Sequence, residues 1–226
     1  MITIITTENA GRHVERLCQM HRLRKEAFND RLGWSVTVSG DLEVDEYDAL
    51  RAVYVLSETA ERVEGSVRLL PTLGPYMLRN TFPSLLNGAE APASANTWEA
   101  SRFAVAYSSA KHEDGLSIAT YELLIGVLEF SLTCNIDAIL CVIDVRMERV
   151  LRRAGWPMTR LCAVRPIGST LTLAGRLEVS ERVLQELKRR MAHDERSVLA
   201  AGAVGSALWR QGTPRPREPR QTHVAM

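Results

Sequence analysis

Three charged residues lie inside segments that the sequence otherwise marks as β-strands. Arg68 interrupts the apolar run at 63–70, and Glu99 and Arg102 lie within the run at 97–106. A charge in the interior of a sheet is costly unless it is paired or used, because burial strips it of water. These residues therefore indicate a polar pocket in which a carboxylate is a candidate general base. An ion pair between Glu99 and Arg102 on an edge strand is the alternative interpretation.

A second group of candidates lies upstream. Arg24 and Phe28 are one helical turn apart and share a face, and Trp34 follows in a segment without periodicity. The acidic run 41–48 comes next. Together these residues offer carboxylates and aromatic faces to a cation. Taken singly, Arg24 is typical of a solvated helix face, and the acidic run is typical of a solvated loop.

Composition argues against several classes of function. The chain has 226 residues with 28 basic and 27 acidic side chains, a net charge of +1. Nothing in this balance points to nucleic acid or to an anionic membrane. The start lacks a basic segment followed by a long apolar one, and no apolar run approaches the length of a membrane span. We therefore expect a soluble, cytoplasmic protein.

The cysteines give no sign of a disulfide framework. Cys18, Cys134, Cys141 and Cys162 are widely spaced in apolar segments and form no Cys-x-x-Cys pair. Buried free thiols are expected rather than disulfides or a zinc site. No metal is expected.

The hydrophobic pattern predicts strands alternating with helices in one domain at 1–199. Strands are expected at 2–6, 52–57, 63–70, 97–106, 138–144, 161–165 and 170–178. Helices are expected at 8–28, 115–133, 146–155 and after Ser180. The segment 29–50 has no period and is predicted to be a long loop. Residues 200–226, rich in proline and arginine, are typical of a disordered tail. The pattern indicates an α/β sandwich with a mixed sheet.

The candidates also share a sparse pattern: R-x(3)-F-x(5)-W, E-x-D-x(2)-D, single R and F positions, and E-x(2)-R. This pattern closely resembles that of the acyl-homoserine-lactone synthases of the LuxI type, over residues 2–193. The surrounding segments are also similar to those of the family: VYVLSE, VRLLPT, TFPSLL, WEASRF and ERVLRRAGWP. The signature positions are Arg24, Phe28, Trp34, Glu43, Asp45, Asp48, Arg68, Phe82, Glu99 and Arg102.

The resemblance implies a GNAT-like α/β/α sandwich whose mixed, mostly antiparallel sheet is splayed to admit an acyl thioester. It implies acyl transfer to the amine of S-adenosylmethionine, followed by attack of the methionyl carboxylate on its own γ-carbon. The products are an N-acyl-homoserine lactone, which is a quorum-sensing signal, and methylthioadenosine. S-adenosylmethionine is then a substrate, the donor is an acyl carrier protein or acyl-CoA, and no permanently bound cofactor is implied.

Residue chemistry suits these implied roles. An α-amine has a pKa of roughly 8 and must lose a proton before attack, so Glu99 is the nominated base and Arg102 fixes it or neighbouring acids. Arg24 and Arg68 are candidates for the acceptor's carboxylate, while its sulfonium and ammonium call for acids and aromatic faces. The set assigned to S-adenosylmethionine is Arg24, Phe28, Trp34, Glu43, Asp45, Asp48, Arg68 and Phe82. The segment 29–48 is expected to close over this ligand as a lid.

The acyl pocket is expected beside the strand that holds Glu99 and the strand at 138–144. Alternation predicts that Ser101 and Phe103 share the face of Glu99. The predicted lining is Ser101, Phe103, Cys141 and Ile143. In the family a threonine hereabouts is associated with 3-oxo acyl chains. Because none occurs at 138–144, an unsubstituted or otherwise non-3-oxo chain is favoured.

The donor site is expected on the helix that follows. Arg146, Arg149 and Arg153 fall on one face, and carrier proteins are acidic, so this face is a candidate carrier-protein surface; a solvated face is equally compatible. The phosphate cradle R/Q-x-x-G-x-G/A is absent near 108–116, which argues against an ordinary acetyl-CoA site. Two other functions stay open. A generic GNAT N-acetyltransferase would not need Trp34, and a non-catalytic acyl-binding protein would tolerate loss of the nominated base.

Overall fold

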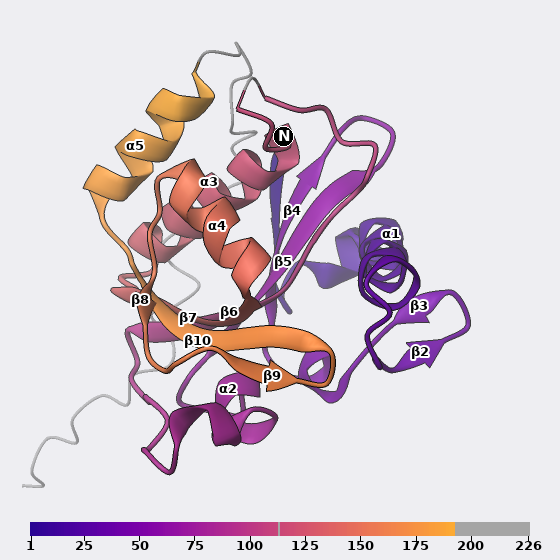
Figure 1. Cartoon of the computed structure of the whole chain (residues 1–226). Coiled ribbons are helices and arrows are strands. Elements are labelled where there is room, and N and C mark those ends of the chain that lie inside the picture. Colours follow the sequence, from indigo (N-terminus) through magenta and orange to yellow (C-terminus); the bar gives the residue numbers. More distant parts are fainter. Residues whose placement is uncertain (113, 193–226) are drawn as a thin grey trace, which may run out of the picture.

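One mixed sheet organises the protein, and the computed structural model describes residues 1–112 and 114–192 of it (Figure 1). The main path runs β1-β4-β5-β6-β7-β10-β8, with β9 paired to β10. Every neighbouring pair is antiparallel except β6 and β7. The strands are β1 (Ile2–Ile5), β4 (Val53–Glu58), β5 (Val63–Pro71), β6 (Thr97–Val105), β7 (Ala138–Asp144), β8 (Thr159–Arg160), β9 (Arg165–Ile167) and β10 (Thr170–Glu178).

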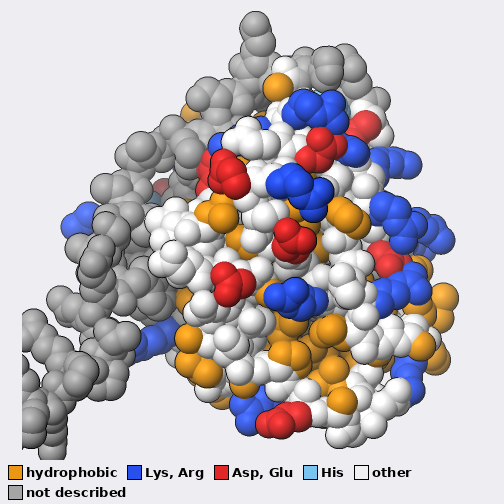
Figure 2. Space-filling view, turned by 90° about the vertical axis from the view of Figure 1, so that its left-hand side faces the viewer, with side chains coloured by type: hydrophobic (Ala, Val, Ile, Leu, Met, Phe, Trp, Pro, Cys, Tyr) orange, Lys and Arg blue, Asp and Glu red, His pale blue; other side chains and the backbone are white. Residues whose placement is uncertain are grey.

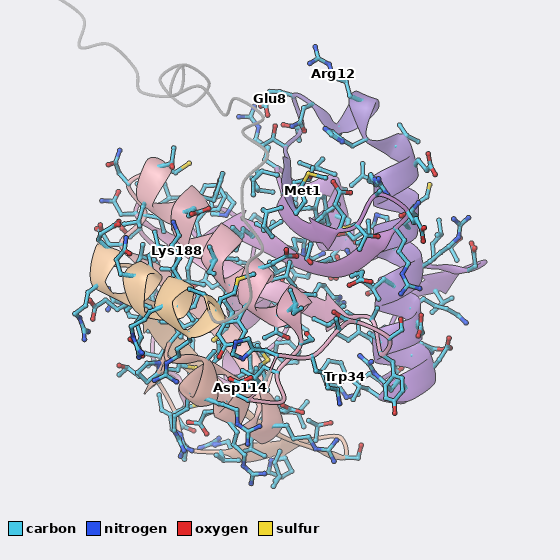
Figure 3. The ribbon with its side chains drawn as sticks, turned by 90° about the horizontal axis from the view of Figure 1, so that it is seen from above. Met1, Glu8, Arg12, Trp34, Asp114 and Lys188 are labelled. Carbon is cyan, nitrogen blue, oxygen red and sulfur yellow. The ribbon has the colours of Figure 1, made fainter. Side chains whose placement is uncertain are left out.

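Helices cover both faces of this sheet. On one face lie α3 (Ile118–Thr133), α4 (Val145–Ala154) and α5 (Glu181–Met191). On the other lie α1 (Val14–Arg24), its continuation η2 (Lys25–Arg31), α2 (Met77–Asn80) and η4 (Pro83–Leu86). Seen from above, α3 and α5 stand on the opposite side of the strands from α1 (Figure 3). The shorter elements are η1 (Ala10–Arg12), β2 (Val38–Ser39), β3 (Leu42–Glu43) and η3 (Glu46–Ala49).

The apolar helix α3 packs tightly against the N-terminal strands. Glycines permit the close approach: a Cβ at Gly126 would lie 2.8 Å from Val55 Cγ1, and one at Gly65 would lie 2.9 Å from Leu123 Cδ1. Ser117 begins the helix by accepting a hydrogen bond from the N–H of Thr120 (3.0 Å). The resulting core fixes β4 and β5 against α3, which makes this side of the molecule a rigid support for the residues on the other side.

A kink in β6 breaks the alternation that the sequence predicts. Arg102 has φ +54°, a left-handed conformation that is uncommon for a side chain with a Cβ. Because of this kink, Ser101 hydrogen-bonds to Arg68 on the α1 face, whereas Phe103 packs into the core on the α3 face. The prediction that Phe103 shares the face of Glu99 is therefore wrong. The strict alternation of side chains between the two faces of a strand is lost where the strand contains a bulge.

The sheet divides just where this kink occurs. The parallel ladder between β6 and β7 contains only the pairs from Thr97–Ala138 to Ala100–Cys141. Beyond Ala100, β6 pairs with β5 alone, and beyond Cys141, β7 pairs with β10 alone. The expected mixed, mostly antiparallel sheet between two helical layers is confirmed.

Three boundaries differ from prediction. The strand expected at 161–165 is wrong, because pairing occurs instead in β8 and β9 on either side of it. The first helix continues as a π-helical turn to Arg31, and the loop expected at 29–50 contains the β2–β3 hairpin and η3. The tail predicted at 200–226 lies outside the described residues. Among the described residues, no helix is long and apolar enough to cross a membrane.

Candidate active site

Six signature side chains form a closed ring of alternating charge where α1, the segment 43–48, β5 and β6 meet. Each arginine contacts two acids, and each acid contacts two arginines, so the ring is neutral as a whole. In order around the ring, the members are Arg24, Glu43, Arg102, Asp45, Arg68 and Asp48, which returns to Arg24. The sequence pattern therefore marks a single structural unit drawn from four segments of chain.

The contacts in the ring are short, and two of them, Arg24–Asp48 and Arg68–Asp45, are bidentate. The Nη1 and Nη2 atoms of Arg24 donate to the two oxygens of Asp48 at 2.8 and 2.9 Å. Arg68 donates to Asp45 at 2.5 and 3.0 Å and to Asp48 at 2.8 Å. Arg102 donates to Glu43 through Nε at 2.9 Å and approaches Asp45 at 2.7 Å. Forked geometry of this kind fixes direction as well as charge.

Burial makes these pairs far more consequential than surface ion pairs. The side chains of Arg68 and Glu43 are fully buried, Arg24 is 1% exposed, and Arg102 is the most accessible member at 13%. Burial alone favours neutral Asp48 and Arg24, but their mutual hydrogen bonds outweigh it, so the pKa of Asp48 falls and the pKa of Arg24 rises. Both groups stay charged throughout the physiological range.

Local sequence explains how the acids reach the ring. Asp45 accepts the N–H of Tyr47 (3.0 Å), and Asp48 accepts the N–H of Asp45 (2.9 Å), which together form a capping box at the start of η3. The same two carboxylates face the arginines. Of the predicted 29–48 lid, the acidic end is therefore fixed by buried ion pairs, and the interpretation of Arg24 as a solvated residue is wrong.

Glu99 lies outside the ring and is 1% exposed. Its two oxygens accept the backbone N–H groups of Met77 and Leu78, each at 2.7 Å. Burial raises the pKa of Glu99 to about 7, although those N–H groups and the charges of Arg68 and Arg102 act in the opposite direction. No hydrogen bond or ion pair links Arg102 to Glu99 among the described contacts, because Arg102 is held by the acids of the ring. Of the two partners predicted for Arg102, the neighbouring acids are the ones it contacts.

The predicted aromatic residues lie beside the ring. Phe28 and Trp34 stack with centroids 5.5 Å apart and an angle of 10° between their planes. The guanidinium of Arg102 lies 5.7 Å from the Phe28 ring centroid, so cation and rings form one stack. Trp34 sits at the edge of the molecule on the α1 side (Figure 3). Phe82 is half-buried and caps η4, farther along the same face.

Sequence reasoning missed three contributors. The sulfur of Met77 lies 3.5 Å from Arg68 and 3.5 Å from Arg102, and Tyr54 donates to Asp48 at 2.8 Å. The ring of Tyr47 lies 5.5 Å from the guanidinium of Arg68. Tyr54 lies in a predicted strand, and its side chain points to the ring, so the alternation of that strand could have identified it. Nothing in the sequence marks Met77.

The predicted acyl-pocket residues do not all meet. Phe103, Cys141 and Ile143 pack together against the core on the α3 face, near the end of the parallel ladder. Ser101 lies on the opposite face, where its hydroxyl accepts a hydrogen bond from Arg68 (3.1 Å). Cys141 is the only buried cysteine, and all four are free thiols; the other three, expected to be buried, are partly exposed.

The predicted donor surface is exposed. Arg146, Arg149 and Arg153 all lie on the outer side of α4, as their spacing predicts. Lys and Arg side chains gather along the right-hand edge of the face in Figure 2. Arg153 also donates to the backbone oxygen of Asp114 (3.4 Å), in the loop before α3. Within that loop a backbone donor is already occupied, because the carboxylate of Asp114 accepts a hydrogen bond from the N–H of Leu116 at 2.9 Å.

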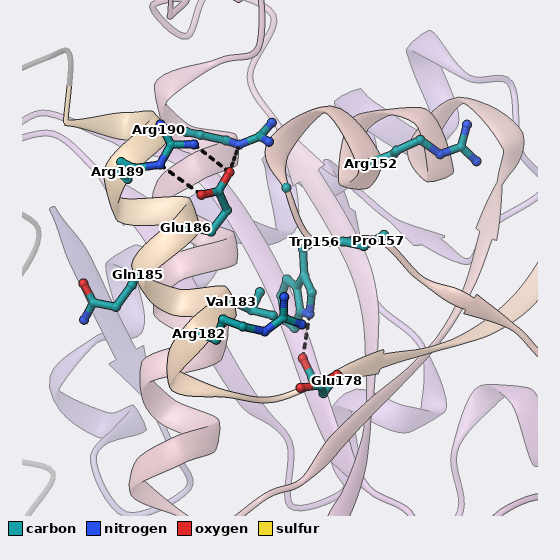
Figure 4. Close-up of a pocket in the computed structure, with 11 residues that line it drawn as sticks. Arg152, Trp156, Pro157, Glu178, Arg182, Val183, Gln185, Glu186, Arg189 and Arg190 are labelled. Carbon is teal, nitrogen blue, oxygen red and sulfur yellow. Dashed lines mark hydrogen bonds and ion pairs between the residues drawn. The ribbon is translucent and has the colours of Figure 1, made fainter.

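One cavity lies away from these groups. It encloses about 580 Å³ between the end of α4, β10 and α5, with Arg182 and Trp156 in its wall (Figure 4). None of the signature residues lines it. Among the described residues, no group of His, Cys, Asp and Glu is arranged to hold a metal ion.

Comparison with known proteins gives one consistent result. The autoinducer synthase family model matches residues 9–187. An acyl-homoserine-lactone synthase of Agrobacterium fabrum is 39% identical over 189 residues, 82% of this chain and 90% of that protein. The crystal structure of the AHL synthase LasI superimposes with a TM-score of 0.73 at 37% identity, covering 83% of this chain and 93% of LasI.

A second solved structure extends the comparison to bound ligands. The CoA-dependent acyl-homoserine lactone synthase BjaI, solved with SAM and isopentyl-CoA, has a TM-score of 0.77 and 28% identity, covering 85% of this chain and 89% of BjaI. The resemblance expected from the ten signature residues is confirmed, and so is the fold class. By family model, sequence and fold alike, this chain belongs to the autoinducer synthase family.

Proposed function

We propose that the protein acylates the amine of S-adenosylmethionine and closes the product to an N-acyl-homoserine lactone, releasing methylthioadenosine. The observation that carries this proposal is the buried carboxyl of Glu99, placed beside the neutral charge ring at the point where β6 and β7 part. A generic N-acetyltransferase needs neither the ring nor the stacked pair Phe28–Trp34. The relative from Agrobacterium fabrum is named as an acyl-homoserine-lactone synthase.

Glu99 has the chemistry of a general base near neutral pH. An acceptor amine with a pKa of roughly 8 must transfer a proton before it attacks the thioester carbonyl. A base is most effective when its pKa lies near the operating pH, and burial brings that of Glu99 to about 7. In the first step the C–N bond forms, the C–S bond of the thioester breaks, and the departing thiolate takes up a proton.

The second step requires alignment rather than proton transfer. The methionyl carboxylate attacks the γ-carbon, a C–O bond forms, and the bond to the sulfonium sulfur breaks with methylthioadenosine as the leaving group. Holding the two groups in line supplies most of the acceleration. We assign this positioning to the ring, with Arg102 as its accessible member and Phe28 and Trp34 as the aromatic faces for the sulfonium.

The ring changes the tasks proposed for Arg24 and Arg68. Their N–H groups already meet carboxylates of the protein, which supports a role in shaping the pocket from behind. Asp45 and Asp48 are likewise paired with arginines. We therefore assign them to the electrostatic potential of the pocket and not to direct contact with the ligand. Glu43 is buried and paired with Arg24 and Arg102, so we assign it the same role as Asp45 and Asp48. Phe82 stays assigned to S-adenosylmethionine binding.

For the donor we propose an acyl carrier protein. Exposed arginines on α4 suit an acidic partner, and the carboxylate of Asp114 occupies the N–H of Leu116, where a phosphate cradle would otherwise offer free donors. Charge reversal at Arg149 should then raise KM for an acyl carrier protein while leaving KM for the matching acyl-CoA unchanged. Equal effects on both donors would contradict this docking surface. The expected cytoplasmic location stays a prediction.

The reaction itself is tested with purified protein and a panel of acyl thioesters. Methylthioadenosine should appear only when S-adenosylmethionine is supplied, and mass spectrometry should detect the homoserine-lactone fragment. Acylation of a different amine, with S-adenosylmethionine inert across the whole panel, would overturn the proposal.

A further inference from the structure

The part of the sheet that would receive the acyl chain ends at a wall of two sulfur atoms. The parallel ladder stops at the pair Ala100–Cys141. Past that pair, Phe103 and Ile143 turn partly buried side chains toward the α3 face, joined by Met147 of α4. If the thioester enters where β6 and β7 part, beside the proposed base Glu99, its acyl chain meets this apolar face.

Met158 covers the sheet at that same level. It belongs to the segment between α4 and β8, and its side chain fills the space above Gly175: a Cβ on Gly175 would lie only 1.9 Å from Met158 Sδ. Gly175 is the cross-strand partner of Cys141. The Sδ of Met158 also lies 3.4 Å from the Sγ of Cys141. Met158 therefore covers β7 and β10 at the level where β6 and β7 separate.

Met158 packs against the apolar core that contains three large aromatic side chains, Trp156, Trp98 and Phe130. Trp156 is 1% exposed and is the largest fully buried side chain described. Its Nε1 donates to the backbone oxygen of Glu178 at 2.7 Å, which fixes the orientation of the indole (Figure 4). Trp98 and Phe130 belong to the same core and pack edge to face, with centroids 5.8 Å apart. An acyl chain that reached Met158 would have to displace side chains of this core to go farther, and packed interiors contain few voids.

We propose that Met158, with Cys141 beneath it, closes the acyl pocket and sets the longest acyl chain that the enzyme accepts. A flexible thioether suits this task, because it adjusts to the end of a chain without strain. Burial raises the pKa of the Cys141 thiol to about 12, so this sulfur acts as a neutral apolar surface. The inference rests on the proposed function and adds to it a determinant of substrate length.

The test compares product profiles from a mixture of acyl donors of increasing chain length. Met158→Ala removes three heavy atoms from the end of the pocket, so the preferred chain should lengthen by about two carbons. Because each methylene that a filled pocket rejects changes kcat/KM about 10-fold or more, the ratio of long to short product should rise at least ~10-fold. Met158→Phe should shift the ratio in the opposite direction.

Met20→Ala is the matched control. It makes the same truncation at a fully buried methionine of α1, on the other face of the sheet, and should leave the chain-length ratio unchanged. If Met158→Ala fails to fold, Met158→Val provides a smaller truncation with the same expected direction. An unchanged ratio in folded, active Met158 variants would overturn the inference. Absence of any lactone from the parent protein with every donor would instead refute the proposed function.

Discussion

The two faces of β5 and β6 are built on opposite principles. On the α3 face, Val67, Leu69 and Trp98 join an apolar core. On the α1 face, Arg68 and Glu99 lie behind helices that exclude water just as completely. The apolar face is stabilised by area removed from water, roughly 25 cal/mol per Å². The charged face is stabilised only while every partner is present, because an unpaired buried charge is far more costly than an unfilled apolar site.

Within this pair of strands, one face therefore stabilises the fold and the other carries the candidate active site. Residues on the α3 face tolerate exchange for others of similar volume, since apolar packing is not directional. Residues on the α1 face do not, because each guanidinium in the ring contacts two carboxylates. The strands thus transmit the rigidity of one face to the geometry of the other, and variants on the two faces should fail in different ways.

The largest effect is expected at Glu99. Glu99→Gln keeps the size of the side chain and removes its basicity, so turnover should fall about 10²–10⁴-fold with little change in affinity for the acceptor. Higher pH should restore part of the loss, because solvent then deprotonates the amine. A variant that loses activity only in proportion to its loss of folded protein would show that Glu99 serves the fold instead.

Opening the ring should be nearly as damaging, but through stability. Arg68→Ala leaves Asp45 and Asp48 short of a partner in a buried site, which should cost about 3–5 kcal/mol of the free energy of unfolding. Denaturant titration measures this loss. The comparison is Leu69→Ala on the apolar face, expected at about 2–5 kcal/mol without loss of the substrate-binding geometry in the surviving folded fraction. Full specific activity in folded Arg68→Ala would argue against a role of the ring in the reaction.

The pH dependence of stability should distinguish Glu99 from the ring. The raised pKa of Glu99 favours its protonated form in the folded state, so its contribution is fully present below pH 4.5 and is lost as the pH rises through about 7. The difference in unfolding free energy between the parent and Glu99→Gln should change by about 3 kcal/mol across this window. Asp48, with a lowered pKa, acts in the opposite sense: its contribution is present above pH 3.8 and lost below it. A flat difference between pH 4.5 and 7 would mean that Glu99 titrates normally.

The smallest effect is expected for a surface pair. Lys188 of α5 is labelled in Figure 3. It contacts Glu129 of α3 at 2.6 Å, but its side chain is 42% exposed. Lys188→Ala should change the free energy of unfolding by less than about 1 kcal/mol and should leave activity unaltered. Added salt should weaken even this small contribution, while the buried ring should respond little. A loss comparable with that of Arg68→Ala would show that burial does not account for the contrast.

Much of the architecture follows from periodic patterns. The strands that carry Arg68 and Glu99 and the apolar helix between β6 and β7 were all predictable, because each is long and strongly patterned. The kink at Arg102 was not predictable, since a left-handed residue in a strand leaves no periodic trace and the partners of Arg102, Glu43 and Asp45, lie far from it in sequence. For the same reason the prediction for Phe103 placed it on the wrong face.

The candidate site shows the same limit. Its residue types were identifiable from sparse spacing, but their partners were not. Spacing cannot tell whether Arg24 faces a ligand or Asp48, because the ring closes between segments distant in sequence. Met77 was missed because its role depends on where its sulfur lies between two guanidinium groups.

The brevity of the parallel ladder also bears on how the chain folds. It joins an N-terminal antiparallel unit, β1 to β6, to a C-terminal one, β7 to β10, through only the pairs from Thr97–Ala138 to Ala100–Cys141. The whole of α3 lies in the connection between β6 and β7, so a long stretch of chain must close before the ladder can form. We therefore expect the seam between the two units to close only when α3 has packed against β4 and β5 and brought β7 beside β6.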